Sequence, residues 1–261
     1  MVVTGGAARY VARSMSSIEQ IVVVGGGVMG SGIAQVTATA GFATRCIDID
    51  PAALERARES VTTGRYGFER AVERGKVTAE DAAAALGRLE FSSTIDDVAA
   101  ADLVIEAVPE RFDLKIRVLR DLDRRMPAAG ILASNTSGFS IAALGAATDR
   151  PDRVIGWHWA SPAQVMRFAE IVRTDATAVA TIDAVCDTAR ACGKNPIVVN
   201  DAATAWGFVA NRIYGAALDE ARRVVEEGVA EREQVDQLMM DCFGWPTGPF
   251  TMIRGATTGW T

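Results

Sequence analysis

The sequence contains one histidine, His158, and only four cysteines among its 261 residues. No two cysteines form a Cys-x-x-Cys pair, so the single histidine has no paired thiols with which it could complete a zinc site. We therefore expect no bound metal. We expect the thiols to be buried and reduced, which favours a cytoplasmic location. The four are Cys46, Cys186, Cys192 and Cys242.

Long apolar runs and an excess of basic residues are also missing. No stretch is long enough to cross a bilayer, and 33 acidic against 27 basic residues give a net charge of −6. This charge offers no electrostatic support for nucleic-acid binding. We therefore expect a small-molecule partner, with no nucleic acid and no membrane, and any anionic group of that partner would need local Lys or Arg side chains.

Residues 1–17 lack both acidic side chains and an apolar run of signal-peptide length. We expect them to form a disordered N-terminal extension, with a short transit peptide as the alternative. The folded part of the chain is then expected to begin at residue 18.

Short apolar runs alternate with helical patterns up to about residue 200. The β-branched, apolar runs predict strands at residues 21–24, 44–49, 103–108, 131–133, 153–157, 170–173 and 197–199. Helical patterns cover residues 51–76 and 174–192, and Thr78 with Asp81 predicts another capped helix start. Beyond residue 200 the strands stop, and residues 208–227 and 231–243 predict amphipathic helices. We therefore expect one domain at residues 18–200 and a helical domain at residues 201–261.

A glycine-rich turn follows the first predicted strand and opens a helix. Its sequence GGGVMG, at residues 25–30, satisfies the G-x-G-x-x-G pattern, whose glycines permit a tight turn, a close approach to a pyrophosphate and helix–strand packing. Asp48 closes the next predicted strand, where a carboxylate can bind the ribose hydroxyls and would repel a 2′-phosphate. The prediction is an α/β fold: a Rossmann-type, doubly wound, mostly parallel sheet with an all-α C-terminal domain, and NAD as the cofactor. The residues expected to bind NAD here are Gly25, Gly27, Val28, Met29, Gly30 and Asp48.

His158 follows the predicted strand at residues 153–157, on the edge where parallel sheets gather their chemistry. Glu170 is an acid within an apolar stretch, and the turn at Ser161-Pro162 could bring the two side chains together. A carboxylate against an imidazole fixes its tautomer and raises its basicity, so the pair could act as a general base. Two other interpretations stay open from these residues alone: a histidine packed in the core, and an edge-strand acid facing water.

Five ordered motifs resemble the 3-hydroxyacyl-CoA dehydrogenase family. They are SNTS at residues 134–137, GWHWASP at 156–162, VMRFAE at 165–170, GFVANR at 207–212 and WPTGPF at 245–250. The segment EAVPE at 106–110, with Lys115, also matches the family. The resemblance covers about residues 20 to 255 and implies NAD-dependent interconversion of a 3-hydroxyacyl-CoA, such as 3-hydroxybutyryl-CoA, and its 3-oxoacyl-CoA.

The resemblance also implies roles for individual residues. His158 would be the general base for the substrate hydroxyl, with Glu170 as its charge partner, and Ser137 and Asn211 would hold the reacting oxygen. The residues implied to lie near the cofactor beyond the glycine-rich turn are Glu110, Lys115, Ser137 and Ser161.

Several features depart from the family pattern. Ser161 replaces the usual asparagine, and Trp206 belongs to a longer link ahead of Asn211. The family's two CoA-contacting residues cannot be placed in this chain, which leaves Arg65 and Lys76 as candidates. Family members also continue beyond Thr261 into a part that usually adds dimer contacts. The resemblance therefore implies a shortened helical domain, and we expect a homodimer or another homo-oligomer.

These departures leave two alternatives for the function. The substrate could be a 3-hydroxy acid without CoA or a related alcohol, as in gulonate- or carnitine-type relatives. The chain could also be a non-catalytic NAD-binding relative. The presence of all four implied catalytic residues argues against the second alternative; they are His158, Glu170, Ser137 and Asn211.

Overall fold

The computed structural model describes residues 18–202 and 204–258, so the extension expected at residues 1–17 lies outside the described residues. The described chain forms an eight-stranded sheet in the order β3-β2-β1-β4-β5-β6-β7-β8. Every neighbouring pair is parallel except β6 and β7, which confirms the predicted Rossmann-type, mostly parallel sheet. The strands are β1 (Gln20–Val24), β2 (Ala43–Ile47), β3 (Leu89–Ser92), β4 (Leu103–Glu106), β5 (Ile131–Ser134), β6 (Val154–Trp159), β7 (Phe168–Arg173) and β8 (Asn195–Asn200).

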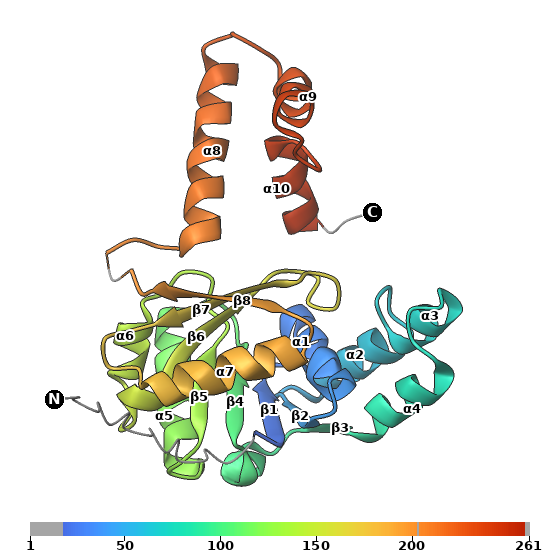
Figure 1. Cartoon of the computed structure of the whole chain (residues 1–261), viewed down its shortest axis with the longest axis vertical. Helices are drawn as coiled ribbons and strands as arrows, with labels where there is room; N and C mark the ends of the chain where they lie inside the picture. The colour runs from blue at the N-terminus through green and yellow to red at the C-terminus, as the bar shows by residue number, and fades with distance from the viewer. Residues whose placement is uncertain (1–17, 203, 259–261) are drawn as a thin grey trace, which may run out of the picture.

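Helices cover both faces of this sheet (Figure 1). Apolar side chains of α1 and α7 share one core with β1, whereas α5 and α6 pack in a second core on the opposite face. Burial on both faces explains why the central strands are continuous apolar runs. The helices are α1 (Val28–Thr39), α2 (Pro51–Thr62), α3 (Phe68–Glu73), α4 (Ala79–Gly87), α5 (Phe112–Arg125), α6 (Ile141–Gly145) and α7 (Val179–Ala191), with short 3-10 turns η1 (Ile95–Ala100) and η2 (Pro151–Arg153).

The helix predicted over residues 51–76 is wrong as one element, because α2 ends at Thr62 and α3 begins at Phe68. The chain turns tightly between them at two glycines. A Cβ added to Gly64 would lie 2.5 Å from the Ser60 carbonyl oxygen, and one added to Gly67 would lie 2.7 Å from the Thr62 oxygen. Only glycine therefore fits this turn without a backbone shift, and the result is a bent helical tail, α2 to α4, at one side of the molecule in Figure 1.

Beyond the last strand, the described elements are the helices α8 (Val209–Glu226), α9 (Arg232–Phe243) and α10 (Pro249–Thr258). They rise from the side of the sheet formed by β7 and β8 (Figure 1). Asp236 of α9 accepts hydrogen bonds from the backbone N–H groups of Phe250 and Thr251 at 2.8 and 2.9 Å, which fixes the start of α10 against α9. None of the described helices combines the length and apolar content needed to cross a membrane.

The four cysteines are free thiols, and three of them are buried as expected. Burial raises the pKa of both Cys46 and Cys192 to about 12, so these thiols stay protonated. Cys242 does not follow the expectation, because it lies in the exposed last turn of α9.

Candidate active site

The glycine-rich turn lies between β1 and α1. Gly25 has φ of +113°, and a Cβ there would come within 2.6 Å of the Ala107 carbonyl oxygen on the neighbouring segment. A Cβ at Gly27, by contrast, would meet nothing within 4 Å, so the backbone at the start of α1 is open to a ligand. Val28, the first residue of α1, is exposed, and Met29 behind it packs against the core. This is the arrangement that binds a pyrophosphate at a helix N-terminus.

Asp48 lies just beyond the end of β2, next to this turn. Its two carboxylate oxygens accept hydrogen bonds from the N–H groups of Gly26 at 2.7 Å and Asp50 at 2.9 Å. Each oxygen keeps a lone pair, so the carboxylate can also accept from two ribose hydroxyls. The same negative charge disfavours a 2′-phosphate in that place.

His158 and Glu170 face each other across β6 and β7. They are direct partners in the antiparallel register, and the imidazole Nδ1 lies 2.8 Å from the Glu170 Oε2. The turn at Ser161-Pro162 does bring the two segments together, but β6 runs to Trp159, so His158 lies inside the strand and not after its end. The two residues are only 6% and 4% exposed.

The second oxygen of Glu170 reaches the helical domain. Oε1 accepts hydrogen bonds from the N–H groups of Val209 at 3.0 Å and Ala210 at 2.9 Å, in the first turn of α8. Burial pushes the pKa of Glu170 upward, but the hydrogen bonds from His158 and from these N–H groups outweigh it, and the pKa lies below its ordinary value. Glu170 is therefore an ionised group that joins His158 to α8.

Ser137 and Asn211 meet at the same junction. Ser137 lies in the loop after β5, and its carbonyl oxygen accepts a hydrogen bond from the Asn211 Nδ2 at 3.3 Å. The next residue, Gly138, contacts the segment that precedes α8. Its carbonyl oxygen accepts a hydrogen bond from the N–H of Gly207 at 3.3 Å. A Cβ at Gly138 would collide with the indole of Trp206 at 2.7 Å. The unusual Trp206 thus packs on the Ser137 loop, and all four implied catalytic residues gather where the two domains meet.

Glu110 and Lys115 are placed differently from each other. Glu110 is at the edge of the site, where its Oε1 accepts from the Ser137 N–H at 2.9 Å. Lys115 is only 1% exposed. Its ammonium lies 2.7 Å from Glu106 Oε1, 3.1 Å from the Val108 carbonyl and 3.2 Å from Glu110 Oε2. Lys115 is therefore buried beneath the site, where its ammonium donates hydrogen bonds to Glu106 and Val108 and forms an ion pair with Glu110.

Ser161 is exposed in the loop between β6 and β7. Lys194 fixes this loop, because its ammonium donates hydrogen bonds to the carbonyl oxygens of Ala163 at 2.6 Å and Met166 at 2.8 Å. The same ammonium lies 5.1 Å from the centroid of the Trp159 ring, and burial lowers the pKa of Lys194.

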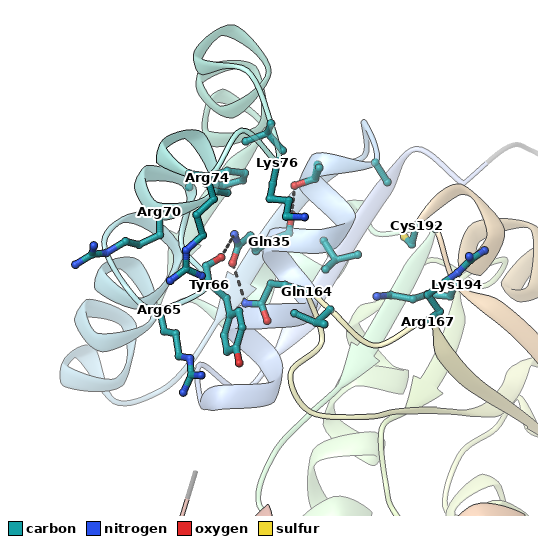
Figure 2. Close-up of a pocket in the computed structure, with 18 of the residues that line it drawn as sticks. Gln35, Arg65, Tyr66, Arg70, Arg74, Lys76, Gln164, Arg167, Cys192 and Lys194 are labelled. Carbon is teal, nitrogen blue, oxygen red and sulfur yellow. Dashed lines mark hydrogen bonds between the residues drawn. The ribbon is translucent and has the colours of Figure 1, made fainter. Parts of the chain in front are cut away.

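A cavity of about 650 Å³ opens between α1, the helical tail and the loop that carries Ser161. Gln35 of α1 donates to the Tyr66 carbonyl at 2.9 Å and accepts from Gln164 at 2.8 Å, so the three walls are joined by hydrogen bonds. Figure 2 shows these glutamines between two groups of cations. The cationic lining residues are Arg65, Arg70, Arg74, Lys76, Arg167 and Lys194.

Of the cations of this cavity, only Arg65 and Lys76 were expected from the sequence. Arg70 and Arg74 stand four residues apart, a spacing that places both on one side of a helix, and this signal was available. Arg167 and Lys194 carry no such signal, because only the fold brings their segments to the tail. Glu106 was also missed, although it is an acid in an apolar strand, the same signal that identified Glu170.

Comparison with known proteins finds matches along nearly the whole described chain. The protein-family model described as "3-hydroxyacyl-CoA dehydrogenase, NAD binding domain" matches residues 20–202. A second family model, described as "3-hydroxyacyl-CoA dehydrogenase, C-terminal domain", matches residues 207–260. A probable 3-hydroxybutyryl-CoA dehydrogenase of Bacillus subtilis is 39% identical over 90% of this chain and 80% of its own length.

Solved structures agree with these matches. The (S)-3-hydroxybutyryl-CoA dehydrogenase from Ralstonia eutropha superposes with a TM-score of 0.86 at 38% identity, over 90% of this chain and 81% of the other. A diketoreductase superposes with a TM-score of 0.81 at 34% identity, over 91% and 83%. The NAD-binding domain match confirms NAD as the cofactor predicted from residues 25–30 and Asp48.

Proposed function

Because this chain belongs to the 3-hydroxyacyl-CoA dehydrogenase family of NAD-dependent oxidoreductases, we propose that it interconverts a 3-hydroxyacyl-CoA of the 3-hydroxybutyryl-CoA type and the corresponding 3-oxoacyl-CoA. The Bacillus subtilis relative is named a probable 3-hydroxybutyryl-CoA dehydrogenase, and the Ralstonia eutropha structure is named an (S)-3-hydroxybutyryl-CoA dehydrogenase. The observation that carries the proposal for this chain is the contact between His158 and Glu170 at the junction of the two domains.

The orientation of that contact supports a proton transfer from the substrate hydroxyl to His158. Glu170 engages Nδ1 of His158, which favours the tautomer with the proton on Nδ1 and leaves the lone pair of Nε2 for the substrate hydroxyl. His158 then takes the hydroxyl proton, and the ionised Glu170 stabilises the imidazolium that forms. Bound NAD⁺ would supply the hydride acceptor for the carbon that bears this hydroxyl.

Ser137 and Asn211 complete the proposed site from its two sides. The Asn211 carboxamide of α8 donates to the backbone carbonyl of Ser137, and this contact supports a site that both residues share. Both groups can donate to the reacting oxygen and hold it beside His158. The site therefore exists only when α8 is docked on the loop after β5.

The cavity lined by cations supports CoA as part of the substrate. CoA carries a 3′-phosphate and a pyrophosphate, and this protein is acidic overall, so binding needs a local positive region. The cavity supplies six cationic side chains, and none of the described residues that line it is acidic. Its wall at Gln164 belongs to the loop that connects β6 to β7, which links it directly to His158 and Glu170.

A substrate without CoA is the second candidate, and the structural likeness to a diketoreductase favours it. A panel of substrates with NAD⁺ separates the two: 3-hydroxybutyryl-CoA, free 3-hydroxybutyrate, gulonate and carnitine, followed by NADH absorbance. We expect turnover with the CoA thioester. Turnover of a free acid with no response to the thioester would refute the CoA proposal, and no turnover of any substrate would favour a non-catalytic NAD-binding protein.

The variant His158→Gln tests the assigned base. We expect kcat to fall by at least about 10²- to 10⁴-fold, the usual contribution of a general base. The dissociation constant for NADH should stay unchanged, because the imidazole acts on the substrate oxygen. Retention of most of the wild-type kcat would show that His158 is only a packing residue.

We also propose a cytoplasmic location and self-association. The free thiols of the buried cysteines fit a reducing compartment. The helical domain exposes several large apolar side chains, which supports a homodimer or another homo-oligomer through this domain. They include Ile213, Leu238 and Phe243.

A further inference from the structure

Glu106 is a fully buried carboxylate at the end of β4, with 0% exposure. Its Oε1 accepts hydrogen bonds from the Val108 N–H at 2.8 Å and from the Lys115 ammonium at 2.7 Å. Its Oε2 accepts from the Ser134 hydroxyl at 2.6 Å. Both oxygens are therefore satisfied, as a buried charge requires.

One path of contacts leads from Glu106 through Lys115 to the site. The Lys115 ammonium also lies 3.2 Å from Glu110 Oε2. On its other side, Glu110 Oε1 accepts from the Thr136 hydroxyl at 2.5 Å and from the Ser137 N–H at 2.9 Å. The ammonium thus joins a carboxylate in the core to one that holds the Ser137 loop.

A second path runs through Ser134 and ends on the same loop. The Ser134 hydroxyl oxygen accepts from the Thr136 N–H at 3.2 Å. The Thr136 hydroxyl oxygen in turn accepts from the N–H groups of Gly138 at 3.3 Å and Phe139 at 3.0 Å. The four backbone N–H groups of residues 136–139 are therefore held by the side chains of Ser134, Glu110 and Thr136. Glu106 contacts Ser134 directly, and it reaches Glu110 through Lys115 and Thr136 through Ser134.

We propose that Glu106 is a positioning residue for the reaction: it fixes the loop of residues 136–139 so that Ser137 stands in register with Asn211 and His158. The inference rests on the proposed function, because that function gives Ser137 its role at the reacting oxygen. Glu106 itself would contact neither substrate nor cofactor. It acts through Lys115, Ser134 and the loop.

The variant Glu106→Gln tests this, because it keeps the size of the side chain but removes the charge. A carboxamide accepts on one side only, so either the Lys115 side or the Ser134 side loses its acceptor. Asp123→Asn is the matched control, since Asp123 is also a buried acid that accepts from a cation, Arg150 at 2.5 Å, and from a backbone N–H, Asp149 at 2.8 Å. It lies on α5, outside the contacts that reach the Ser137 loop.

We expect Glu106→Gln to lower kcat by about ten- to a hundredfold, the scale of a small misplacement of a reacting group, with KM changing much less. Hydrogen exchange in a peptide that spans residues 135–139 should become faster. Asp123→Asn should lower the melting temperature without either effect. Wild-type kcat and exchange in Glu106→Gln, or equal effects in both variants, would overturn the proposal.

If Glu106→Gln fails to fold, Ser134→Ala cuts the second path alone and should show the same two changes at smaller size. Unchanged kcat and unchanged exchange in Ser134→Ala would then refute the proposal. Failure of the proposed function is distinguishable, because it would appear as absent turnover in the wild-type protein. The exchange measurement would still decide whether Glu106 holds the loop.

Discussion

We propose that the Asp48 carboxylate sets the preference for NAD over NADP. Its oxygens are held by the N–H groups of Gly26 and Asp50, so its orientation next to the glycine-rich turn is fixed. We expect NADH to bind much more tightly than NADPH. Asp48→Ala should narrow this difference, because it removes the repulsion of the 2′-phosphate and the acceptor for the hydroxyls. Fluorescence titration of both cofactors measures it, and equal affinities in the wild-type protein would contradict the assignment.

Glu170 makes the stability of the protein depend on pH. Its folded-state pKa lies below the ordinary value, because the hydrogen bonds from His158, Ala210 and Val209 outweigh the effect of burial. The stabilisation is therefore fully present above the unfolded pKa of a glutamate, about 4.3, and is lost as the pH falls through the lower folded pKa.

Glu170→Gln should remove this contribution. In urea unfolding, the variant should be less stable than the wild type at pH 7, and the difference should shrink as the pH is lowered below about 4.3. A difference that stays constant over this range would mean that the charge of Glu170 contributes no stability.

At the scale of elements, we expect the helical tail to hold the CoA part of the proposed substrate. We expect the double variant Arg65→Ala/Arg74→Ala to raise KM for 3-hydroxybutyryl-CoA by about tenfold or more, because each charge-assisted hydrogen bond to a phosphate contributes roughly 1.5–3 kcal/mol. A 3-hydroxybutyryl thioester of N-acetylcysteamine lacks the phosphates, so its KM should not change.

The matched control is Arg56→Ala, since Arg56 is an exposed cation of the neighbouring helix α2 but does not line the cavity. Its KM for the CoA thioester should equal that of the wild type. An equal rise for both thioesters in the double variant would show that the tail affects catalysis by another route.

The elements that the sequence predicted well are those with a strong local signal. The strand before the glycine-rich turn is an uninterrupted β-branched run, and the cap of α4 follows from Thr78, which accepts from the Asp81 N–H as predicted. The turn between α2 and α3 was not predicted, because the residues around Gly64 and Gly67 still fit a single helical pattern. Helices α5, α6 and α10 and the strand β3 were not identified as separate elements.

The site was predictable where a motif carried it. The glycine-rich turn, Asp48, His158 and Glu170 could be named from the sequence, and the structure brings the last two into contact. The burial of Lys115 could not be foreseen, because it depends on how the connection from β4 to α5 folds both Glu106 and Glu110 onto its ammonium. The cavity likewise arises from three segments that only the fold brings together.

For the molecule as a whole, the exposed apolar side chains of the helical domain predict self-association. We expect static light scattering to show a dimer or a higher oligomer. Leu238→Asp combined with Phe243→Asp should shift the protein toward monomer, because the introduced charges would have to be buried in the interface. NADH affinity should stay unchanged. A wild-type protein that is monomeric at high concentration would contradict this prediction.

The register pairing of His158 with Glu170 also bears on how the site can open. Both residues lie on paired strands inside the sheet, so their contact has little freedom to change while the sheet is intact. The contacts that can separate are those to the helical domain: the two N–H groups of α8 on Glu170, and Asn211 on Ser137. Motion between the domains would therefore divide the proposed site into two parts: His158 and Glu170, which would stay fixed in the sheet, and the α8 part, which would separate and return. A substrate that enters while the domains are apart would find the proposed base, His158, already oriented. Only the proposed contacts of Ser137 and Asn211 with its reacting oxygen would still have to form.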